Sequence, residues 1–223
     1  MKGQGCIHGV TVPEAYDRLI GRIVPSQPLL LQTALDYLPP SPELVLELGC
    51  GTGILTGLLR AACPNCALTA LDIDPKMLEI AAAKPELEGV RFIAGDLRDP
   101  WPGECSDVII TALCLHHVSL AERSEVAERA ARLLLPGGRF ICADIFRAEQ
   151  EWEEELLTES WRRAMAREGA PGDVIEGMVL QRANRMPHLS TVSWFQDRLR
   201  EAGFSRVVVP FTAGFVALVV GIR

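Results

Sequence analysis

The stretch Leu46-Glu47-Leu48-Gly49-Cys50-Gly51-Thr52-Gly53 decides the fold of this chain of 223 residues. It leaves an apolar strand-like run and leads into residues 54–63, which read as a helix ended near Pro64. Three alternate glycines let the backbone turn tightly and let a ligand approach with no Cβ in the way. Nineteen residues past Gly53, after a second apolar run, Asp72 is placed to accept hydrogen bonds from a ribose diol. The pattern therefore predicts a ligand site at the start of the helix.

Strand-like and helix-like runs alternate outward from this loop. The expected strands cover 45–48, 67–71, 90–94, 107–113 and 139–145, and the expected helices cover 54–63, 75–83 and 120–134. Such alternation predicts βαβ units and a mostly parallel sheet. Near-continuous apolar strands such as 108–110 indicate a sheet that is covered on both faces. A further helix at 192–202 and strands at 205–210 and 215–222 close the sequence.

Two helical segments stand outside this alternation. The first contains expected helices at 13–23 and 27–38, and the second covers residues 147–189. We therefore expect a single domain over residues 1–223. Its expected parts are an N-terminal helical cap (1–42), a cofactor-binding core (43–146), a helical lid insertion (147–189), and a terminal helix and strand hairpin (190–223).

Composition narrows the class of protein. The chain is 48% hydrophobic and 23% charged, so it can bury a sizeable core. A net charge of −7 argues against non-specific binding to nucleic acid or to an anionic membrane. The apolar stretch 207–222 is broken by Pro210 and Gly214, so it predicts two strands and no membrane span. Seven scattered cysteines and no apolar leader favour reduced thiols in a cytoplasmic protein, and the lone Cys63–Cys66 pair argues against a zinc site.

The motifs resemble, in order and spacing, those of the class I S-adenosylmethionine-dependent methyltransferases. They are the loop 47–53, the acidic loop 71–78, the loop 95–97, the strand 107–113, the turn 135–140 and the closing segment 202–204. The resemblance implies an α/β fold with a Rossmann-like, doubly wound sheet of seven strands. That sheet is mostly parallel with an antiparallel C-terminal strand, and N-terminal helices and a helical insertion before the last helix are added to it. It also implies S-adenosylmethionine as the cofactor and S-adenosylhomocysteine as the product.

The resemblance further implies roles for the residues around the loop. Glu47 would organise the loop and meet the amino group of the cofactor, Asp72 would hold the ribose, Ile73 and Met77 would pack on the adenine, and Asp96 and Leu97 would meet its edge. Gly49, Cys50, Gly51, Gly53, Ala112, Leu113 and Tyr16 complete the expected cofactor site. Met77 has an alternative role in the helix core, and Tyr16 has one in packing on the sheet. Asp74 is expected to cap the next helix, with ribose contact as the alternative.

The acceptor side is less determined, because in-line methyl transfer needs alignment and, at most, a base. His116 and His117 follow the fourth strand and are candidate bases, with His117 favoured, although the pair could simply hold the loop. Asp144, His188, Trp152 and Trp161 are candidate substrate residues. The spacing of Asp144, His188 and the His116–His117 pair matches no metal signature, so we expect no metal. Apolar residues at helical spacing predict one helix with a single apolar face, made of Trp152, Leu156, Leu157, Trp161 and Met165. This face would form either a lid over the substrate or a cover for the sheet edge or the N-terminal helices.

The sequence thus predicts a methyltransferase that acts on an O, N or S atom of a small molecule, as a monomer or homodimer, without nucleic acid or membrane. One alternative is a transfer-RNA wobble-uridine-modifying transferase or a synthase of a carboxylated cofactor. That alternative needs an arginine for the extra carboxylate, and Arg22, Arg147, Arg182 and Arg185 are candidates. Another alternative is a non-catalytic, cofactor-binding activator subunit.

Overall fold

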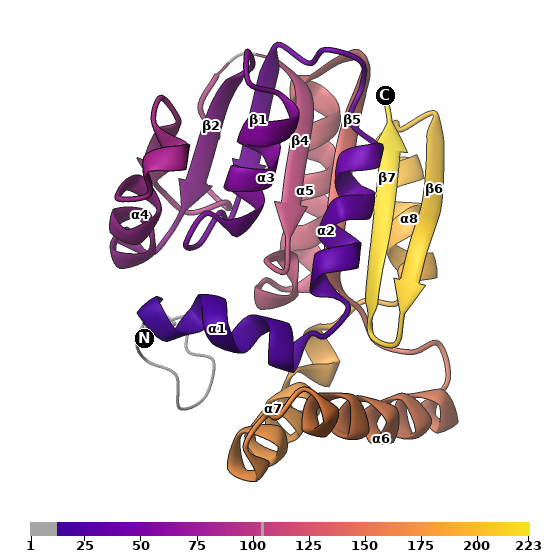
Figure 1. Cartoon of the computed structure of the whole chain (residues 1–223). Helices are drawn as coiled ribbons and strands as arrows, with labels where there is room; N and C mark the ends of the chain where they lie inside the picture. The colour runs from indigo at the N-terminus through magenta and orange to yellow at the C-terminus, as the bar shows by residue number, and fades with distance from the viewer. Residues whose placement is uncertain (1–12, 104) are drawn as a thin grey trace.

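The computed structural model describes residues 13–103 and 105–223. Its centre is a seven-stranded sheet with the strand order β3-β2-β1-β4-β5-β7-β6 (Figure 1). Strands β1 to β5 run parallel to one another, whereas β7 is antiparallel to both β5 and β6. The predicted sheet with one reversed strand is confirmed. The strands are β1 (Leu44–Leu48), β2 (Ala67–Asp72), β3 (Arg91–Ala94), β4 (Ser106–Ala112), β5 (Leu134–Ile145), β6 (Arg206–Ala213) and β7 (Val216–Ile222).

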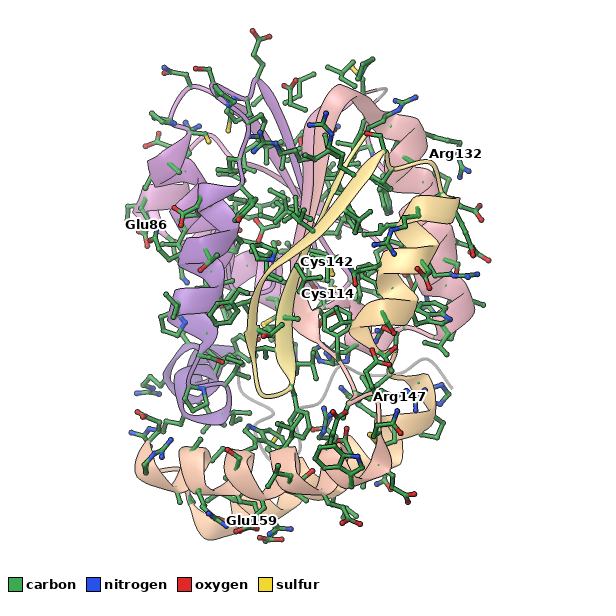
Figure 2. All side chains as sticks on the ribbon, turned by 90° about the vertical axis from the view of Figure 1, so that its right-hand side faces the viewer. Glu86, Cys114, Arg132, Cys142, Arg147 and Glu159 are labelled. Carbon is green, nitrogen blue, oxygen red and sulfur yellow. The ribbon has the colours of Figure 1, made fainter. Side chains whose placement is uncertain are left out.

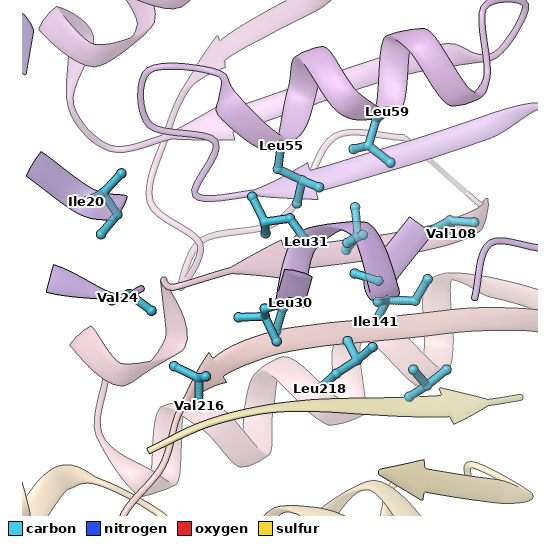
Figure 3. Close-up of a cluster of buried hydrophobic side chains, with 14 of the residues drawn as sticks. Ile20, Val24, Leu30, Leu31, Leu55, Leu59, Val108, Ile141, Val216 and Leu218 are labelled. Atoms are coloured by element: carbon cyan, nitrogen blue, oxygen red, sulfur yellow. The ribbon is translucent and has the colours of Figure 1, made fainter. Parts of the chain in front are cut away.

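Helices cover both faces of the sheet because its central strands are apolar on both sides. In β4, Val108 and Ile110 pack on the face of α2 and α3, whereas Ile109 packs on the face of α5 and α8. Figure 3 shows the first of these two cores, which includes Leu30 and Leu31 of α2, Leu55 of α3 and Leu218 of β7. Each fully buried side chain of this size contributes roughly 1.5–3 kcal/mol to folding. The helices are α1 (Pro13–Ile23), α2 (Gln27–Asp36), α3 (Ile54–Ala62), α4 (Pro75–Ala82), α5 (Leu120–Leu133) and α8 (Val192–Glu201).

Two strands differ from their expected extent. Strand β5 starts at Leu134, five residues early, because the Pro136-Gly137-Gly138 turn forms an irregularity within the strand. Gly137 has φ +78° there and donates its N–H to the carbonyl of Arg223. Strand β6 continues past Pro210 to Ala213, and its register with β7 shifts between Val208 and Phe211. An edge strand accommodates a proline because it has a side free of ladder bonds.

The helical insertion forms a pair of helices, α6 (Glu151–Arg167) and α7 (Gly172–Arg185), followed by a short 3-10 turn η3 (Met186–His188). Ion pairs from Arg162 to Glu176 and from Arg182 to Glu154 show that the two helices run antiparallel. Figure 1 places this pair below the carboxyl ends of β4, β5 and β6, and α1 lies beside it. In a parallel sheet this is the edge where ligands bind.

Within the described ranges, every helix is too short or too polar to cross a bilayer. The six cysteines of those ranges are free thiols, and Figure 2 shows Cys114 and Cys142 near the middle of the molecule. Cys63 ends α3 and Cys66 directly precedes β2, as the sequence predicts. Cys6 lies outside the described residues.

Candidate active site

The glycine loop takes the backbone conformation that its sequence demands. Gly49, Gly51 and Gly53 have φ values of +71°, +54° and +86°, which side-chain-bearing residues rarely adopt. A methyl group at Gly49 would lie 2.1 Å from Sγ of Cys114, and one at Gly53 would lie 2.7 Å from Leu87. A methyl group at Gly51 would meet no protein atom within 4 Å. Two glycines are therefore required by packing, whereas Gly51 leaves open space beside the backbone.

Two carboxyl groups flank this loop. Glu47 is 1% exposed, and Thr56 Oγ1 donates to its Oε2 at 2.6 Å. Burial raises the pKa of Glu47 to about 8, although the Thr56 bond acts in the opposite direction. Asp72 accepts the N–H of Gly51 at 2.7 Å and the N–H of Asp74 at 2.9 Å. Burial raises the pKa of Asp72 too, and these two bonds oppose the effect. Asp72 thus stands against the loop and keeps acceptor capacity on both oxygens.

Side-chain hydrogen bonds hold helix α1 against the glycine loop. Thr52 Oγ1 donates to Asp17 Oδ1, and Lys84 Nζ lies 2.9 Å from the other oxygen of Asp17. The neighbouring Tyr16 is half-buried in the core on the α2 face. Burial raises the pKa of its hydroxyl, and the charges of Asp17, Cys114 and Asp72 add to the rise. Tyr16 therefore lies close to the loop, with its hydroxyl withdrawn from water.

Beyond Asp72, the expected adenine side is partly open. The side chain of Ile73 is 58% exposed, which is unusual for an isoleucine and leaves an apolar surface for a ring. Met77 is half-buried in α4 and does not belong to the clusters of buried side chains. Asp74 accepts the N–H of Lys76 at 2.9 Å and caps α4, which confirms the preferred role.

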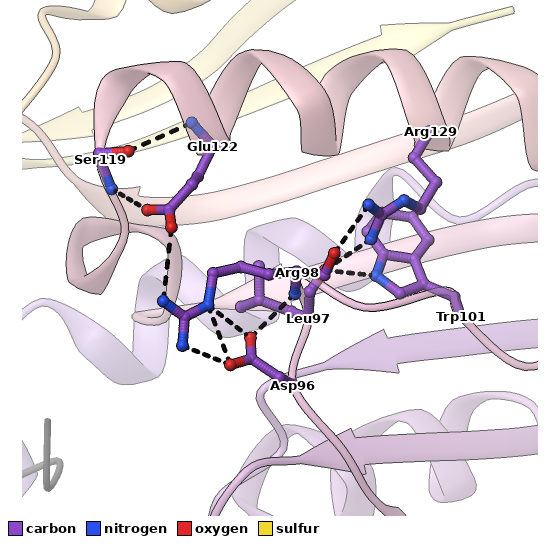
Figure 4. A network of polar contacts seen from close by, with 7 residues as sticks. All are labelled: Asp96, Leu97, Arg98, Trp101, Ser119, Glu122 and Arg129. Atoms are coloured by element: carbon purple, nitrogen blue, oxygen red, sulfur yellow. Dashed lines mark hydrogen bonds and ion pairs between the residues drawn. The ribbon is translucent and has the colours of Figure 1, made fainter. Parts of the chain in front are cut away.

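The 96–101 loop closes the same side through a polar network (Figure 4). Arg98 pairs with both oxygens of Asp96 and reaches Glu122 at 3.4 Å. This pairing holds the pKa of Asp96 below its usual range, so its carboxylate is charged. The carbonyl of Leu97 accepts from Trp101 Nε1 at 2.7 Å and from Arg129 at 2.9 Å. The Asp96–Leu97 edge is therefore held rigidly at the mouth of the site.

The end of β4 connects this loop to the histidines. Leu113 has φ +50°, an uncommon conformation that redirects the chain directly after the strand. Its N–H donates to the carbonyl of Ala143 at 2.8 Å. Cys114 then packs against Gly49, and the 3-10 turn η2 (Leu115–His117) begins. His116 thus lies two residues from the side chain that touches the glycine loop.

His116 and Asp144 form a buried pair. Nδ1 of His116 lies 2.6 Å from Oδ1 of Asp144, and Oδ2 accepts the backbone N–H of His116 at 2.9 Å. The side chain of Asp144 is 1% exposed, and its Oδ1 also accepts the N–H of Ile145. Because a carboxylate only accepts, Nδ1 carries a proton, and the neutral form of the ring presents its lone pair on Nε2. This is the arrangement of an oriented general base.

His116 lies on the walls of two cavities, of about 290 Å³ and about 260 Å³. The larger cavity is enclosed by three segments that are distant in sequence, namely the α1–α2 connection, the α6–α7 pair and the β6–β7 turn. Its apolar walls include Leu157, Trp161, Met178, Leu189 and Phe215. The smaller cavity is lined by His116, His117, Val118, Ser119, Arg185 and His188. The geometry thus offers an apolar chamber with an oriented histidine on its wall.

The candidate substrate residues separate into two groups. Trp161 lines the larger cavity, where its Nε1 donates to the carbonyl of Ile23 at 2.6 Å and its ring meets Phe215 edge-on at 5.7 Å. Asp144 contacts His116 and does not line either cavity, whereas His188 lines the smaller one. Trp152 is 64% exposed and does not line either cavity. The single apolar face expected for α6 is therefore corrected: Trp152 lies on its outer side, and Trp161 on its inner side.

His117 has a different environment from His116. Its ring centroid lies 4.2 Å from that of His116. The pKa of His117 is held well below its usual value by the charge of His116, by burial, and by Arg185 and Arg123. His117 is thus neutral near pH 7, yet no carboxylate orients it within the described part of the chain. The structure consequently favours His116 over His117 as the oriented base, against the preference drawn from sequence.

Two residues that support the site have no motif in the sequence. Asp17 joins α1 to the glycine loop across 35 positions of the chain. Arg123 is 1% exposed and donates to the carbonyl of Leu115 at 2.9 Å and to Ser190 Oγ at 2.6 Å, which fixes the turn that carries His116. Arg123 shares the helical face of Val126 and Ala130, and this spacing was a signal of its burial. Nothing comparable marks Asp17.

Comparison with known proteins identifies what this arrangement resembles. Residues 45–138 match the family model described as a methyltransferase domain. The chain is 32% identical over 117 residues to malonyl-[acyl-carrier protein] O-methyltransferase of Hahella chejuensis, covering 50% of this chain and 41% of that protein. It is 27% identical over 217 residues to carboxy-S-adenosyl-L-methionine synthase of Pseudomonas putida, covering 88% and 84%. The chain thus spans less than half the length of the first of these relatives.

Among solved structures, an O-methyltransferase family protein from Burkholderia thailandensis superposes with a TM-score of 0.71. The two chains are 21% identical, and the match covers 97% of this chain and 60% of the other. The likeness extends to the fold of the whole described chain, including the helices added outside the matched family region.

Proposed function

Because the chain belongs to the class I S-adenosylmethionine-dependent methyltransferases, we propose that it methylates a small molecule seated in the 290 Å³ cavity beside His116. The position of the Asp144–His116 pair is the observation that supports this cavity as the acceptor site. Its histidine lies both on the cavity wall and two residues from the contact of Cys114 with the glycine loop. A cofactor on that loop and an acceptor in that cavity would therefore approach each other at His116.

The residues around the loop fit S-adenosylmethionine. Gly51 provides open space for close approach of a ligand to the backbone, which a Cβ would fill. Glu47 is a buried carboxyl with a raised pKa. An ammonium group beside it would stabilise the charged carboxylate and so lower that pKa. Asp72 keeps free acceptor capacity for a ribose diol, and the exposed Ile73 offers an apolar surface for adenine. We assign these four residues to the amino, sugar and base parts of the cofactor.

When bound, S-adenosylmethionine supplies a methyl group that is already activated for displacement. Nε2 of His116 takes the proton that the acceptor hydroxyl or amine loses as it attacks, and Asp144 stabilises the resulting imidazolium. The Nδ1 bond to Asp144 fixes the ring, so that the lone pair is presented without rotation. Trp161 and Phe215 hold the apolar part of the acceptor and exclude water. An acceptor with an ionisable hydroxyl suits this base best.

Calorimetry with S-adenosylhomocysteine tests the cofactor assignment. Asp72→Ala removes the charged acceptor for the ribose hydroxyls, and the loss of one such hydrogen bond, about 1.5–3 kcal/mol, should lower affinity roughly 10- to 150-fold. Asp197→Ala is the matched control, because Asp197 is 61% exposed on α8 and pairs only with Arg200 among the described residues. Absence of binding to the unaltered protein, or equal affinity of the Asp72→Ala variant, would reject the assignment.

A second candidate is synthesis of a carboxylated cofactor. It is favoured by the Pseudomonas putida synthase, which this chain matches over most of both lengths. Incubation of the protein with S-adenosylmethionine and a carboxylate donor, followed by mass spectrometry of the nucleoside, separates the two candidates. A carboxylated sulfonium product would favour the synthase, whereas S-adenosylhomocysteine formed only with an added acceptor would favour the methyltransferase.

A further inference from the structure

The larger cavity has a charge opposite to that of the protein. The chain carries a net charge of −7, yet the cavity walls include Arg167, Arg182 and Arg185 and contain no aspartate or glutamate. His116 is the remaining titratable group of the lining. A positive chamber in an acidic protein concentrates anions, because low-dielectric walls focus the field.

One of these arginines is already neutralised. Arg182 donates from Nε to Glu154 Oε1 at 2.6 Å and from Nη2 to the carbonyl of Phe146 at 2.9 Å. Its guanidinium also lies over the ring of Phe215, 3.1 Å from the centroid. Arg182 therefore ties α7 to α6 and to the β6–β7 turn, and its charge is balanced within the protein.

Arg185 is not balanced in this way. It is half-buried and lines both cavities at the place where they meet beside His116. Burial lowers the pKa of Arg185, and no carboxylate opposes the effect. In residues 13–103 and 105–223, Arg185 forms no ion pair. A half-buried guanidinium without an acidic partner in the protein can pair with a carboxylate that a ligand supplies.

None of the side chains that line the smaller cavity with Arg185 is acidic. His116, His117 and His188 line the smaller cavity with it, and Ser119 there caps the N-terminus of α5. The charge of Arg185 is one of the causes that depress the pKa of His117, as is that of the buried Arg123. The positive potential thus reaches into the second cavity, and nothing acidic in its lining offsets it.

We propose that Arg185 binds a carboxylate of the compound that fills the larger cavity, so that the substrate is an amphiphilic acid with an apolar body. Guanidinium groups pair with carboxylates through two parallel hydrogen bonds, which suits a planar acid at this position. The apolar body would contact Trp161, Phe215 and Met178, and Arg167 would add charge at the rim. This inference rests on the proposed function and names the class of its substrate.

Two molecules can supply such a carboxylate, namely the acceptor and a cofactor whose transferred group is carboxylated. A panel of alkyl and aryl carboxylic acids and their matched primary amides is tested by thermal shift, with S-adenosylhomocysteine bound. Acids should raise the Tm more than their amides, and Arg185→Gln should remove the difference. Arg163→Gln is the matched control, because Arg163 is 72% exposed on α6 and pairs with Glu159. S-adenosylhomocysteine affinity should be equal in all three proteins, which separates this test from that of the cofactor site.

A second arm compares carboxy-S-adenosylmethionine with S-adenosylmethionine by calorimetry. Preference for acids over amides that Arg185→Gln abolishes supports a carboxylate on the acceptor. A preference for the carboxylated cofactor that Arg185→Gln abolishes supports the same site with the carboxylate on the cofactor. The proposal is overturned if no carboxylate is preferred over its neutral partner, or if the preference survives in Arg185→Gln. As an independent readout, a bound acid should raise the pKa of His117 in an NMR titration, because it offsets the charge of Arg185.

Discussion

Oδ1 of Asp144 lies 2.6 Å from Nδ1 of His116, and Oδ2 of the same carboxylate accepts the backbone N–H of His116. One buried side chain thus fixes both the ring and the backbone of the residue that faces the cavity. Asp144 and His116 come from the ends of neighbouring parallel strands, β5 and β4. Any rotation of the ring must break its bond to Asp144, whose side chain is 1% exposed.

This pairing predicts unequal roles for the two adjacent histidines. His116→Ala should lower kcat by about 10²- to 10⁴-fold, because that is the usual contribution of a general base. Asp144→Asn should also lower kcat, since an amide can donate to Nδ1 and stabilise the wrong tautomer. Initial rates of S-adenosylhomocysteine formation with an accepted substrate measure both effects. Affinity for S-adenosylhomocysteine should stay unchanged, and His117→Ala should lose much less activity; a larger loss in His117→Ala would contradict the assignment.

The glycine loop predicts a separation between stability and binding. Gly51→Ala should cost about 1–2 kcal/mol of folding free energy for its positive φ, and should weaken S-adenosylhomocysteine binding more than about tenfold. Gly137→Ala is the matched control, because Gly137 has φ +78° and equally open surroundings far along β5. It should show the folding cost alone. Thermal unfolding and calorimetry on both variants provide the comparison, and equal affinities would mean that the loop does not approach the cofactor.

Glu47 predicts a proton release on cofactor binding. With a pKa of about 8, its carboxyl is mostly protonated at pH 7 in the free protein. A nearby ammonium group lowers that pKa, so binding of S-adenosylhomocysteine should expel a proton. Affinity should therefore rise between about pH 6 and pH 8 and level off above the pKa. Calorimetry in buffers of different ionisation enthalpy counts the protons, and Glu47→Gln should abolish the buffer dependence.

The same group has a measurable effect on stability. Because the folded state holds this proton more tightly than the unfolded state, the contribution of Glu47 is complete below its ordinary pKa of 4.5. That contribution is lost as the pH rises through about 8. The free energy of unfolding of the cofactor-free protein should thus decline over this range, and the decline should be shallower in Glu47→Gln. An identical pH profile for both proteins would refute the raised pKa.

The contact of Asp17 with Thr52 predicts a role for α1 in retaining the cofactor. Asp17→Ala removes the acceptor of the buried Thr52 hydroxyl and the partner of Lys84. We expect S-adenosylhomocysteine affinity to fall about fivefold, close to 1 kcal/mol, mainly through faster dissociation. Stopped-flow fluorescence measures the dissociation rate. Arg18→Ala, which alters the exposed neighbour, should leave that rate unchanged; a similar acceleration in both variants would point to general loosening of α1.

How far the sequence predicts this site depends on the range of each interaction. The glycine loop and the Asp74 cap are local, so the spacing of their residues determined both. The choice between His116 and His117 is not local, because the 3-10 turn and a carboxylate 28 positions away decide which ring is oriented. The role of Asp17 could likewise not be predicted from the sequence, since its partner Thr52 lies 35 positions away in the glycine loop.

The sequence of helix α6 already excludes the single apolar face that we expected from its apolar residues. Trp152 and Trp161 are nine residues apart, which is two and a half turns of an α-helix at about 3.6 residues per turn. They must therefore lie on opposite sides. Leu156 shares the outer side with Trp152 and is 62% exposed, whereas Leu157 lines the cavity with Trp161.

The composition of the larger cavity has a consequence for how such a protein can diversify. Of the residues that line it, only His116 falls within the matched region 45–138. The remaining wall comes from the α1–α2 connection, the end of β5 at Ile145, the α6–α7 pair, Leu189 and the strands beyond α8. Under the proposed function, the glycine loop that binds the cofactor and most of the wall that selects the acceptor lie in different parts of the polypeptide. Exchange of the α6–α7 segment between relatives should therefore change which acceptor is methylated and leave cofactor binding at the glycine loop unchanged.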